Sequence, residues 1–386
     1  MIDNETVTGI ICEYNPFHNG HMYHIQQAKK QTNCKYVICA MSGSMVQRGE
    51  VAIFDKWQRA SAAVDGGADL VIELPAYYVL QSAENFAYGG VSLLHKLGVV
   101  DYLAFGSESG SIDSLTKIAD IMTNEPREYS AALKQALDRG MGYPAACECA
   151  LRAASGSDFD FQPNDILAIN YIKALRGIHS AIEPVAIRRT NDYHSISAMG
   201  NIASATAVRT MLADGDDISS YVPHITDTTY HARNMQSFVL GFFRTAEAQK
   251  LNCITGMEPG LANRLINCAK SNVDYDSFVN ACVTKRYTRH RIQRVIMCCL
   301  LGIGGKYNMD YVRVLAMNQN GRRLLGEIKK RSNLDIVTKT ADFTPTDDSM
   351  FKFDILATDI AALCCSDKTK RTASKDYITS PYIKNV

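Results

Sequence analysis

Asn15-Pro16-Phe17-His18-Asn19-Gly20-His21-Met22 is the stretch that decides the fold of this 386-residue chain. It follows an apolar run at residues 7–12, typical of a β-strand, and leads into a predicted helix at 21–31. Helical spacing puts His18 and His21 on one face, and a helix N-terminus offers free N–H groups and a positive dipole end to an anion. The glycine between the histidines lets a phosphate approach the backbone. The pattern predicts that both histidines are catalytic and act on an α-phosphate during nucleotidyl transfer.

Two simpler interpretations of the histidine pair compete with catalysis. A pair of histidines in a loop more often caps a helix or belongs to a metal site than to a catalytic site. A metal site is disfavoured because no third His, Cys or carboxylate follows at ligand spacing, so we expect no metal-ligating residues. The position between a first strand and a helix favours catalysis.

Residues 1–215 alternate segments typical of strands with segments typical of helices. Further strands are predicted at residues 36–41, 69–75, 101–105 and 184–187, with helices at about 56–65, 83–96 and in the stretch up to about 153. Such alternation predicts an α/β fold with a doubly wound parallel sheet of the HUP/Rossmann-like type. Ligands of such sheets bind at the carboxyl ends of the strands, where the candidate residues fall.

The pattern changes to helices after Pro223. We therefore expect two domains: an ATP-binding catalytic domain at 1–215 and a mostly α-helical, basic domain at 220–386 that binds RNA. The predicted helices lie at residues 237–251, 260–272, 275–283, 289–301 and 322–330. The net charge of the chain is +1, but residues 285–331 carry twelve Lys or Arg against two acidic residues, an excess of +10. Such asymmetry suggests a polyanionic partner.

One helix of this basic region has the composition of an RNA-binding surface. Arg286, Arg289, His290 and Gln293 follow helical spacing, and apolar residues repeat that spacing on another face. A solvated surface helix would show the same pattern. The local excess of positive charge favours contact with an RNA backbone, and we expect Arg286, Arg289 and Arg294 to make it.

A second candidate phosphate site lies at residues 204–209. Ser204 and Thr206 enter a predicted helix, and Arg209 follows three residues after Thr206. Hydroxyls, fresh helix N–H groups and a guanidinium are suited to the β and γ phosphates of ATP. Ser204 could equally be a simple N-cap. The two signatures together, in the order expected for this type of nucleotidyltransferase, favour the ATP site.

Other strand ends supply weaker candidates. Arg188 and Arg189 end the fifth strand, where a cation could reach the nucleotide, although an arginine there is exposed by default. Gly106 follows the fourth strand and could be part of a simple turn. Asn164 is predicted to cap a helix at 165–176, which is the more common role of such a residue. The polar loop at 41–50 could bind a second substrate or be plain surface.

The composition places the chain in a reducing compartment. No apolar run approaches a membrane span, and residues 1–5 lack the basic region of a secretory signal. The twelve cysteines include adjacent pairs in apolar helical runs and no CxxC, which fits buried thiols better than disulfides. We expect a cytoplasmic protein with no membrane contact and no stable protein partner.

Several motifs together carry a family resemblance. They are Glu13-Tyr14-Asn15-Pro16-Phe17-His18-Asn19-Gly20-His21, Met41-Ser42-Gly43 with Gln47-Arg48-Gly49-Glu50, Asp69-Leu70-Val71-Ile72-Glu73-Leu74-Pro75, Phe105-Gly106-Ser107-Glu108 and Asp192-Tyr193-His194. This combination resembles the bacterial tRNA(Met) cytidine acetate ligase family over nearly the whole chain, including Val312-Arg313-Val314-Leu315 in the region expected to be helical.

The resemblance implies a two-step reaction. ATP and acetate form acetyl-adenylate and pyrophosphate, with Mg²⁺ bridging the phosphates. The acetyl group then passes to N4 of the wobble cytidine of elongator tRNA(Met), giving N4-acetylcytidine and AMP, and the enzyme grips the anticodon stem-loop. The implied ATP contacts are Ile11, Cys12, Glu13, Tyr14, Asn15, Pro16, Phe17, His18, Asn19, Gly20, His21, His24, Gly106, Asn164, Arg188 and Arg189, beside Ser204, Thr206 and Arg209.

Two other functions fit parts of the sequence. A small-molecule adenylyltransferase of the coenzyme type would share the histidine motif, but the long basic helical region argues against it. A non-catalytic RNA-binding protein would keep the fold, but the intact His18, His21 and 204–209 segment argues against loss of activity.

Overall fold

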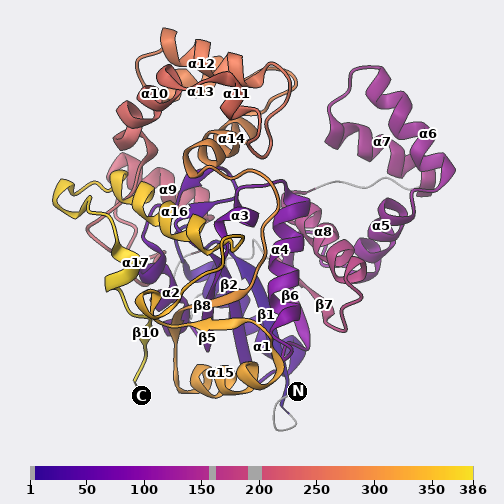
Figure 1. The fold of residues 1–386 in the computed structure, drawn as a ribbon. Helices are drawn as coiled ribbons and strands as arrows, with labels where there is room; N and C mark the ends of the chain where they lie inside the picture. The colour runs from indigo at the N-terminus through magenta and orange to yellow at the C-terminus, as the bar shows by residue number, and fades with distance from the viewer. Residues whose placement is uncertain (1–4, 156–161, 190–201, 386) are drawn as a thin grey trace.

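The computed structural model describes residues 5–155, 162–189 and 202–385, and a central sheet organises them (Figure 1). The strands of the sheet follow the order β10-β8-β5-β2-β1-β6-β7, and β9 pairs with β8. Their bounds are β1 Val7–Cys12, β2 Tyr36–Ser42, β5 Leu70–Leu74, β6 Tyr102–Ser107, β7 Glu183–Arg188, β8 Tyr311–Met317, β9 Asp335–Val337 and β10 Tyr382–Ile383. The neighbours of β1, β2 and β6 are parallel, and β8 is antiparallel to β5.

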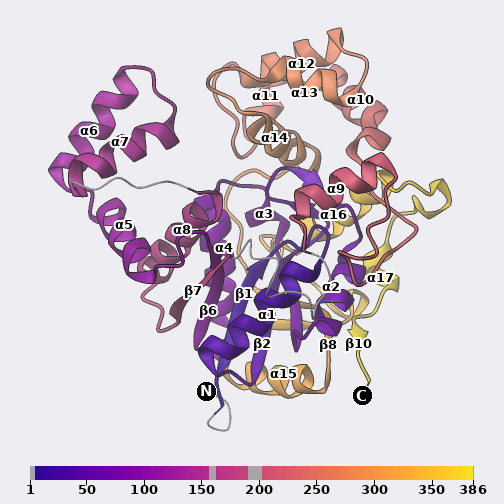
Figure 2. The ribbon, with the colours of Figure 1, turned by 180° about the vertical axis from the view of Figure 1, so that it is seen from behind.

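The sheet is buried on both faces, which explains its continuous apolar strands. Alternate residues of β2 enter two different cores: Val37 and Cys39 pack on one face, and Tyr36 and Ile38 pack on the other. Helices α1 Asn19–Thr32 and α2 Lys56–Asp65 cover the first face. Helices α3 Ala76–Val79, α4 Ala83–Lys96 and α8 Pro163–Gly177 contribute to the second core. Figure 2 shows α1 in front of the sheet, on the side opposite α4 in Figure 1. The expected doubly wound α/β architecture is confirmed.

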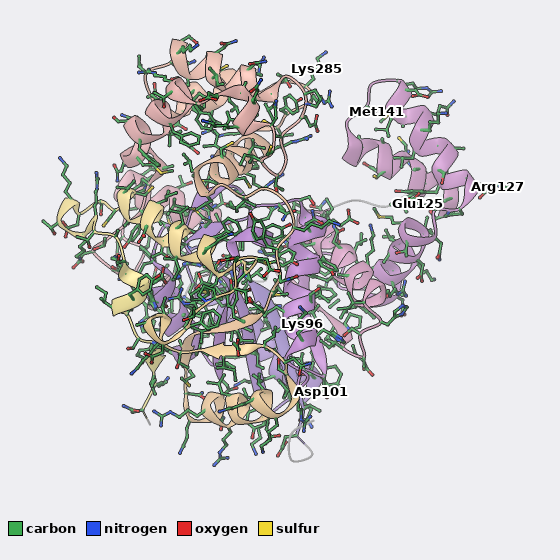
Figure 3. The ribbon with its side chains drawn as sticks, viewed as in Figure 1. Lys96, Asp101, Glu125, Arg127, Met141 and Lys285 are labelled. Carbon is green, nitrogen blue, oxygen red and sulfur yellow. The ribbon has the colours of Figure 1, made fainter. Side chains whose placement is uncertain are left out.

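Most of the remaining helices gather above the carboxyl ends of the strands and to one side (Figures 1 and 2). The upper group comprises α9 Ala205–Asp214, α10 Gln236–Thr245, α11 Ala248–Leu251, α12 Leu261–Ser271, α13 Tyr275–Cys282, α14 Arg289–Leu301 and α16 Phe351–Leu363. On the side, α5 Ile112–Asn124 leads to the paired helices α6 Arg127–Asp138 and α7 Tyr143–Ser155. In Figure 3, Met141 beyond α6 and Lys285 before α14 mark these two separate groups. Near the chain end, α17 Lys375–Ile378 precedes β10.

Strand β8 corrects the expectation that residues 312–315 belong to a helical region. The sequence pattern assigned residues 312–315 to the helical region, but all seven residues of β8 are buried in the sheet beside β5. The chain after residue 220 therefore supplies both the upper helices and strands of the central sheet. The pattern was misleading because Arg313 interrupts an otherwise apolar run, and its partners lie far away in the sequence.

A buried ion cluster explains how an arginine can occupy β8. The Nζ atom of Lys56 lies 2.9 Å from Glu73 and 2.8 Å from Asp376, and all three side chains are almost fully buried. Arg313 Nε lies 3.4 Å from Glu73, and its guanidinium also pairs with Asp376. The cluster thus joins α2, β5, β8 and α17. Buried charges are tolerated only when they are paired in this way.

A neighbouring carboxyl group extends the cluster. Asp354 of α16 accepts hydrogen bonds from the Ala76 main-chain N–H at 2.7 Å and from the Tyr311 hydroxyl. Burial, followed by the nearby charge of Glu73, raises the pKa of Asp354 from 3.8 to about 8. The Asp354 carboxyl group is therefore largely protonated at neutral pH.

The basic run at 285–331 is split in space. The arginines of α14 lie above the carboxyl ends of the strands, Arg313 is buried in the ion cluster, and α15 Gln319–Arg331 lies at the opposite end of the sheet (Figure 1). Asp69, at the start of β5, anchors α15 there by accepting hydrogen bonds from Asn318 and Asn320 at 2.9 and 3.2 Å. The residues that give the excess charge of +10 therefore do not form a single basic surface.

Two broad features of the described residues bear on compartment and metals. No helix among them is long and apolar enough to cross a membrane, and no group of three or more His, Cys, Asp or Glu among them could hold a metal ion. The cysteines are free thiols.

Breaking the ion cluster should destabilise the fold strongly. We expect Lys56→Met to lower the free energy of unfolding by about 3–5 kcal/mol, because it leaves Glu73 and Asp376 short of a counter-charge in the interior. The measurement is urea denaturation followed by circular dichroism. Lys330→Met is the matched control: Lys330 pairs with Glu327 at 2.6 Å, but its side chain is 70% exposed. Its loss should cost less than about 1 kcal/mol. Equal effects of the two substitutions would contradict a structural role for the cluster.

The raised pKa of Asp354 predicts a specific pH dependence of stability. Because the folded pKa of about 8 exceeds the unfolded value near 3.8, the stabilising contribution is complete below the unfolded pKa and is lost as the pH rises through about 8. We expect the wild type to lose stability relative to Asp354→Asn between pH 5 and pH 8, by up to about 1.4 kcal/mol per pH unit. Denaturation series over this range provide the measurement, and parallel pH profiles would refute the assignment.

Candidate nucleotide-binding site

The two motif histidines lie at the beginning of α1. This helix begins at Asn19, two residues earlier than the sequence predicted. His18 is the N-cap, and its Nδ1 accepts a hydrogen bond from the Gly20 N–H at 3.0 Å. His21 Nδ1 in turn accepts from the His18 main-chain N–H at 3.3 Å, which completes a capping box. In a neutral imidazole only one nitrogen carries a proton. Because both Nδ1 atoms act as acceptors, both protons reside on Nε2, where they can be donated to a ligand.

The surroundings keep both rings neutral. The rings of His18 and His21 are stacked with centroids 3.8 Å apart, and Tyr14 packs against His21 at 4.8 Å. Burial, followed by the charges of Arg189 and Arg209, lowers the pKa of His18 from 6.5 to about 4. Burial and the neighbouring His18 lower the pKa of His21 well below its usual value. The pair therefore offers two uncharged N–H donors at neutral pH.

His24 continues the histidine row one turn further along α1. Its Nε2 atom is buried and has no hydrogen-bond partner among the described residues. Burial and then Arg189 lower the pKa of His24 to about 4, against the opposing effect of a main-chain hydrogen bond to Phe105. A buried imidazole nitrogen without a partner fits a polar group of a bound nucleotide.

The segment at 204–209 meets the histidine motif as the sequence predicted. Ser204 is the N-cap of α9 and accepts from the Ala207 N–H at 3.1 Å, so the simple capping role also holds. Arg209 Nη1 donates to the Asn15 carbonyl oxygen at 2.7 Å, and its Nη2 donates to Thr206 Oγ1 at 3.1 Å. A guanidinium and two hydroxyl-bearing residues thus lie beside the loop that carries the histidines.

Arg59 is a buried organiser of the site that the sequence pattern did not reveal. From α2 it donates to the Glu13 carbonyl at 2.6 Å, to the Ser42 carbonyl at 3.1 Å and to the Phe54 carbonyl at 3.0 Å, and it also contacts the Gly43 carbonyl. It therefore joins the loops that follow β1 and β2. Its only sequence signal is an arginine among the apolar positions of a helix, which does not identify its partners.

Tyr14 and Phe17 form the inner wall of the motif loop. Both side chains are buried in the core between α1, α2 and the sheet, and the Tyr14 hydroxyl lies 3.4 Å from Cys39 Sγ. The Ile11 side chain packs closely against α4 at Gly90. Burial raises the pKa of the Cys12 thiol, so that it remains uncharged. Any nucleotide contact by Tyr14 or Phe17 would therefore come from the main chain.

Pro16 and Asn19 are also buried near the histidines, and Asn19 donates to the carbonyls of Tyr221 and Ser220.

The loop after β6 is hydrogen-bonded to the start of α8, and these contacts correct the expected role of Asn164 as a helix cap. The prediction that Asn164 caps this helix is wrong, because α8 begins at Pro163 and its N-cap is Gln162. Asn164 instead donates from Nδ2 to Glu108 at 2.5 Å, and the Asp165 carboxylate accepts from the Glu108 N–H at 3.1 Å. Asn164 therefore reaches the loop after β6, as its expected place at the site requires.

The two arginines at the end of β7, Arg188 within the strand and Arg189 directly after it, lie near different glycines. A Cβ atom built on Gly106 would lie 3.5 Å from Arg189, whereas one built on Gly110 would lie 2.8 Å from Arg188. The charge of Arg189 also helps to lower the pKa of His18 and His24, so it lies near the histidine row. The neighbouring motif at 192–194 lies outside the described residues.

The expected RNA-binding arginines have different environments. Arg286 pairs with Glu258 at 2.5 Å with its side chain 68% exposed, and Arg289 pairs with Asp276 at 2.5 Å with 37% exposed. Arg294 is half-buried, and its Nη1 donates to the Gln47 carbonyl at 3.2 Å. Two of the three cations thus lie at the surface of the upper helical group, and the third faces the hairpin of β3 Met45–Val46 and β4 Glu50–Val51.

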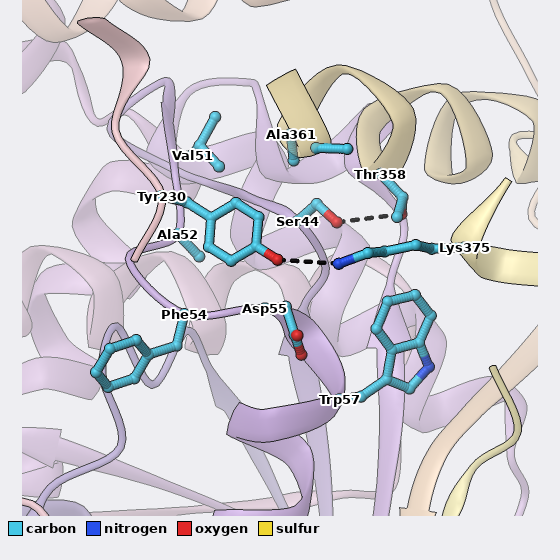
Figure 4. Close-up of a pocket in the computed structure, with 11 residues that line it drawn as sticks. Ser44, Val51, Ala52, Phe54, Asp55, Trp57, Tyr230, Thr358, Ala361 and Lys375 are labelled. Carbon is cyan, nitrogen blue, oxygen red and sulfur yellow. Dashed lines mark hydrogen bonds between the residues drawn. The ribbon is translucent and has the colours of Figure 1, made fainter. Parts of the chain in front are cut away.

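Two cavities lie near this hairpin and α2, and neither is lined by His18 or His21. The cavity in Figure 4 lies between the hairpin, α16 and α17, where Lys375 Nζ contacts the Tyr230 hydroxyl at 3.1 Å. None of the expected ATP contacts lines it. The other cavity is lined by Gln58, His224 and Thr226 and includes only Phe17 of the motif loop.

Known proteins are similar to this chain in sequence and in fold over almost their whole length. Residues 5–376 match the family model of the HIGH Nucleotidyl Transferases. The tRNA(Met) cytidine acetate ligase of Acetivibrio thermocellus is 36% identical over 96% of this chain and 98% of that protein. The tRNA(Met) cytidine acetate ligase of Caldanaerobacter subterraneus subsp. tengcongensis is 39% identical over 92% of this chain and 94% of that protein.

Solved structures agree with the sequence comparisons. The crystal structure of Thermotoga maritima TmcAL bound with alpha-thio ATP has a TM-score of 0.86 and 29% identity, covering 98% of this chain and 99% of that one. Its apo form gives a TM-score of 0.87 at the same identity. The chain therefore belongs to the HIGH nucleotidyl transferase family and, within it, to the tRNA(Met) cytidine acetate ligases.

Proposed function

We propose that the protein is an ATP-dependent acetate ligase that acetylates N4 of the wobble cytidine of elongator tRNA(Met). The observation that carries the proposal is the pair of neutral histidines, His18 and His21: their Nδ1 atoms accept main-chain hydrogen bonds, which leaves the Nε2–H groups as donors at the mouth of α1. The free cysteines suit the reducing cytoplasm, where tRNA is modified. Mass analysis of tRNA after incubation with ATP and labelled acetate tests the proposal, and an adenylylated small molecule instead would favour a coenzyme-type adenylyltransferase.

In the first step, acetate attacks the α-phosphorus of ATP in line. A new bond forms between the acetate oxygen and the phosphorus, the bond to the β-phosphate oxygen breaks, and pyrophosphate leaves. His18 and His21 donate to the α-phosphate oxygens as negative charge develops there. A positioned donor of this kind contributes roughly 2.7–4 kcal/mol to the barrier reduction.

The rest of the triphosphate meets the 204–209 segment. Arg209 is fixed to the motif loop through the Asn15 carbonyl, so its charge lies beside the histidine pair. Ser204 and Thr206 supply hydroxyl groups at the start of the same helix. Mg²⁺ would be held by the phosphates and water, and would supply positive charge that neutralises the phosphates.

The second step transfers the acetyl group to RNA. The N4 amine attacks the carbonyl carbon of acetyl-adenylate, a C–N bond forms, the C–O bond to AMP breaks, and the amine loses a proton. Acetyl-adenylate is already activated, so the main task of the protein is to position the amine. Arg286 and Arg289 lie above the strand ends and are suited to phosphates of the anticodon stem-loop.

Loss of the His18 donor should impair adenylation without loss of the fold. We expect His18→Asn to lower kcat for acetate-dependent ATP–pyrophosphate exchange by about 10²–10³-fold, because asparagine keeps the N-cap but lacks the Nε2–H donor. His18→Ala should lose the same activity and the cap. His95→Ala, at an exposed histidine bonded to Ser180, is the control and should remain fully active. Unchanged exchange in His18→Asn would refute the catalytic assignment.

The division of the basic run predicts which arginines bind tRNA. Arg286→Ala and Arg289→Ala should weaken tRNA binding and reduce the slope of log K against log salt by about 0.9 for each phosphate that is no longer neutralised. Arg323→Ala removes the same charge from α15, at the opposite end of the sheet, and should bind tRNA like the wild type. Filter binding over a range of salt concentrations gives both quantities. Equal losses in all three variants would show that the position of the charge does not matter.

A further inference from the structure

Helix α14 is in direct backbone contact with the β3–β4 hairpin. The contact is at residues 47–50, which we call the hairpin turn. Gly49 has a positive φ of 76°, and a Cβ atom built on it would lie 2.2 Å from the Arg294 nitrogen. Only glycine allows this approach. On both sides of it, the buried Gln293 donates from Nε2 to Glu50 Oε1 at 3.1 Å, and Arg294 donates to the Gln47 carbonyl at 3.2 Å.

The hairpin turn is joined on its other side to the motif loop. The Gln47 N–H donates to Glu13 Oε1 at 2.6 Å. Glu13 lies two residues before Asn15, whose carbonyl holds Arg209, and five before His18. The main chain of Gln47 thus donates to the motif loop through its N–H and accepts from α14 through its carbonyl. A continuous series of hydrogen bonds connects α14 with the proposed ATP site.

Arg294 differs from the other arginines of this region in its partners. Arg286, Arg289 and Arg291 each form an ion pair with Glu258 or Asp276. Within the described ranges, no ion pair is formed by Arg294, and burial lowers the pKa of its guanidinium. A cation withdrawn from solvent and directed at a main-chain carbonyl is better suited to holding the hairpin turn than to contacting a mobile RNA phosphate.

We propose that Arg294 and Gln293 are positioning residues for adenylation. They fix the hairpin turn, so that the Gln47 N–H holds Glu13 and thereby the loop that presents His18 to ATP. The inference rests on the proposed function and replaces the expected RNA contact by Arg294. If tRNA bound at α14 changes the affinity for ATP through this connection, ATP must change the affinity for tRNA by the same factor.

The test is acetate-dependent ATP–pyrophosphate exchange in the absence of tRNA. Arg294→Ala should raise KM for ATP by about tenfold, because small displacements of positioned groups have large effects. Arg294→Lys should recover part of the loss, since lysine can donate to the Gln47 carbonyl. Arg291→Ala is the matched control: it removes the same charge from the same helix, but Arg291 contacts Glu258 and Tyr287. It should leave KM for ATP unchanged, and all the variants should melt like the wild type.

Other outcomes distinguish the alternatives. If Arg294→Ala exchanges like the wild type but binds tRNA as weakly as Arg289→Ala, then Arg294 contacts RNA and the inference is wrong. If Arg294→Ala does not fold, Gln293→Met removes the bond to Glu50 at similar volume and should raise KM for ATP in the same direction. If the wild type shows no acetate-dependent exchange, the proposed function fails. ATP affinity from calorimetry on Arg294→Ala and Arg291→Ala then still tests the inference, and equal affinities would overturn it.

Discussion

The buried ion cluster is the constraint on which the rest of the structure depends. Lys56 and Arg313 can remain charged in the interior only because Glu73 and Asp376 lie within ion-pair distance. Their pairing requires α2, β5, β8 and α17 to meet at one point, although these elements span most of the chain. Gly43 lacks a side chain at this point, and a Cβ atom there would lie 2.0 Å from Glu73 Oε1. The loop after β2 therefore rests directly on the cluster.

Helix α2 connects this cluster with the proposed ATP site. It carries two buried cations three residues apart, and each serves a different partner. Lys56 pairs with Glu73 of β5 and with Asp376 of α17, whereas Arg59 donates to the carbonyls of Glu13 and Ser42 at the carboxyl edge of the sheet. Helical spacing brings both cations to one buried side of α2. The geometry of the motif loop thus depends on the same helix that anchors β8.

How well the sequence predicted each feature depends on how far apart in the sequence the interacting residues lie. The strands of the N-terminal half, the histidine pair and its meeting with Arg209 were predicted, because strand ends of a parallel sheet meet at one edge. Strand β8 was not, because the counter-charges of Arg313 lie at residues 73 and 376. Arg59 was missed for the same reason. Composition found an excess of basic residues but could not show that it divides between two ends of the sheet, since only the fold determines where α14 and α15 lie.

The capping interpretation and the catalytic interpretation of the histidine motif are compatible with the same geometry. His18 caps α1, and the cap itself fixes the tautomer, because Nδ1 must accept from the Gly20 N–H. His21 is fixed likewise by the His18 N–H. Burial, with the charges of Arg189 and Arg209, then keeps the pKa of His18 low. These cations would also attract a triphosphate, whose negative charge favours protonation of the imidazole. The ATP-free protein therefore presents neutral N–H donors. When ATP binds, the negative charge of its phosphates would favour the protonated imidazole, which is a stronger donor.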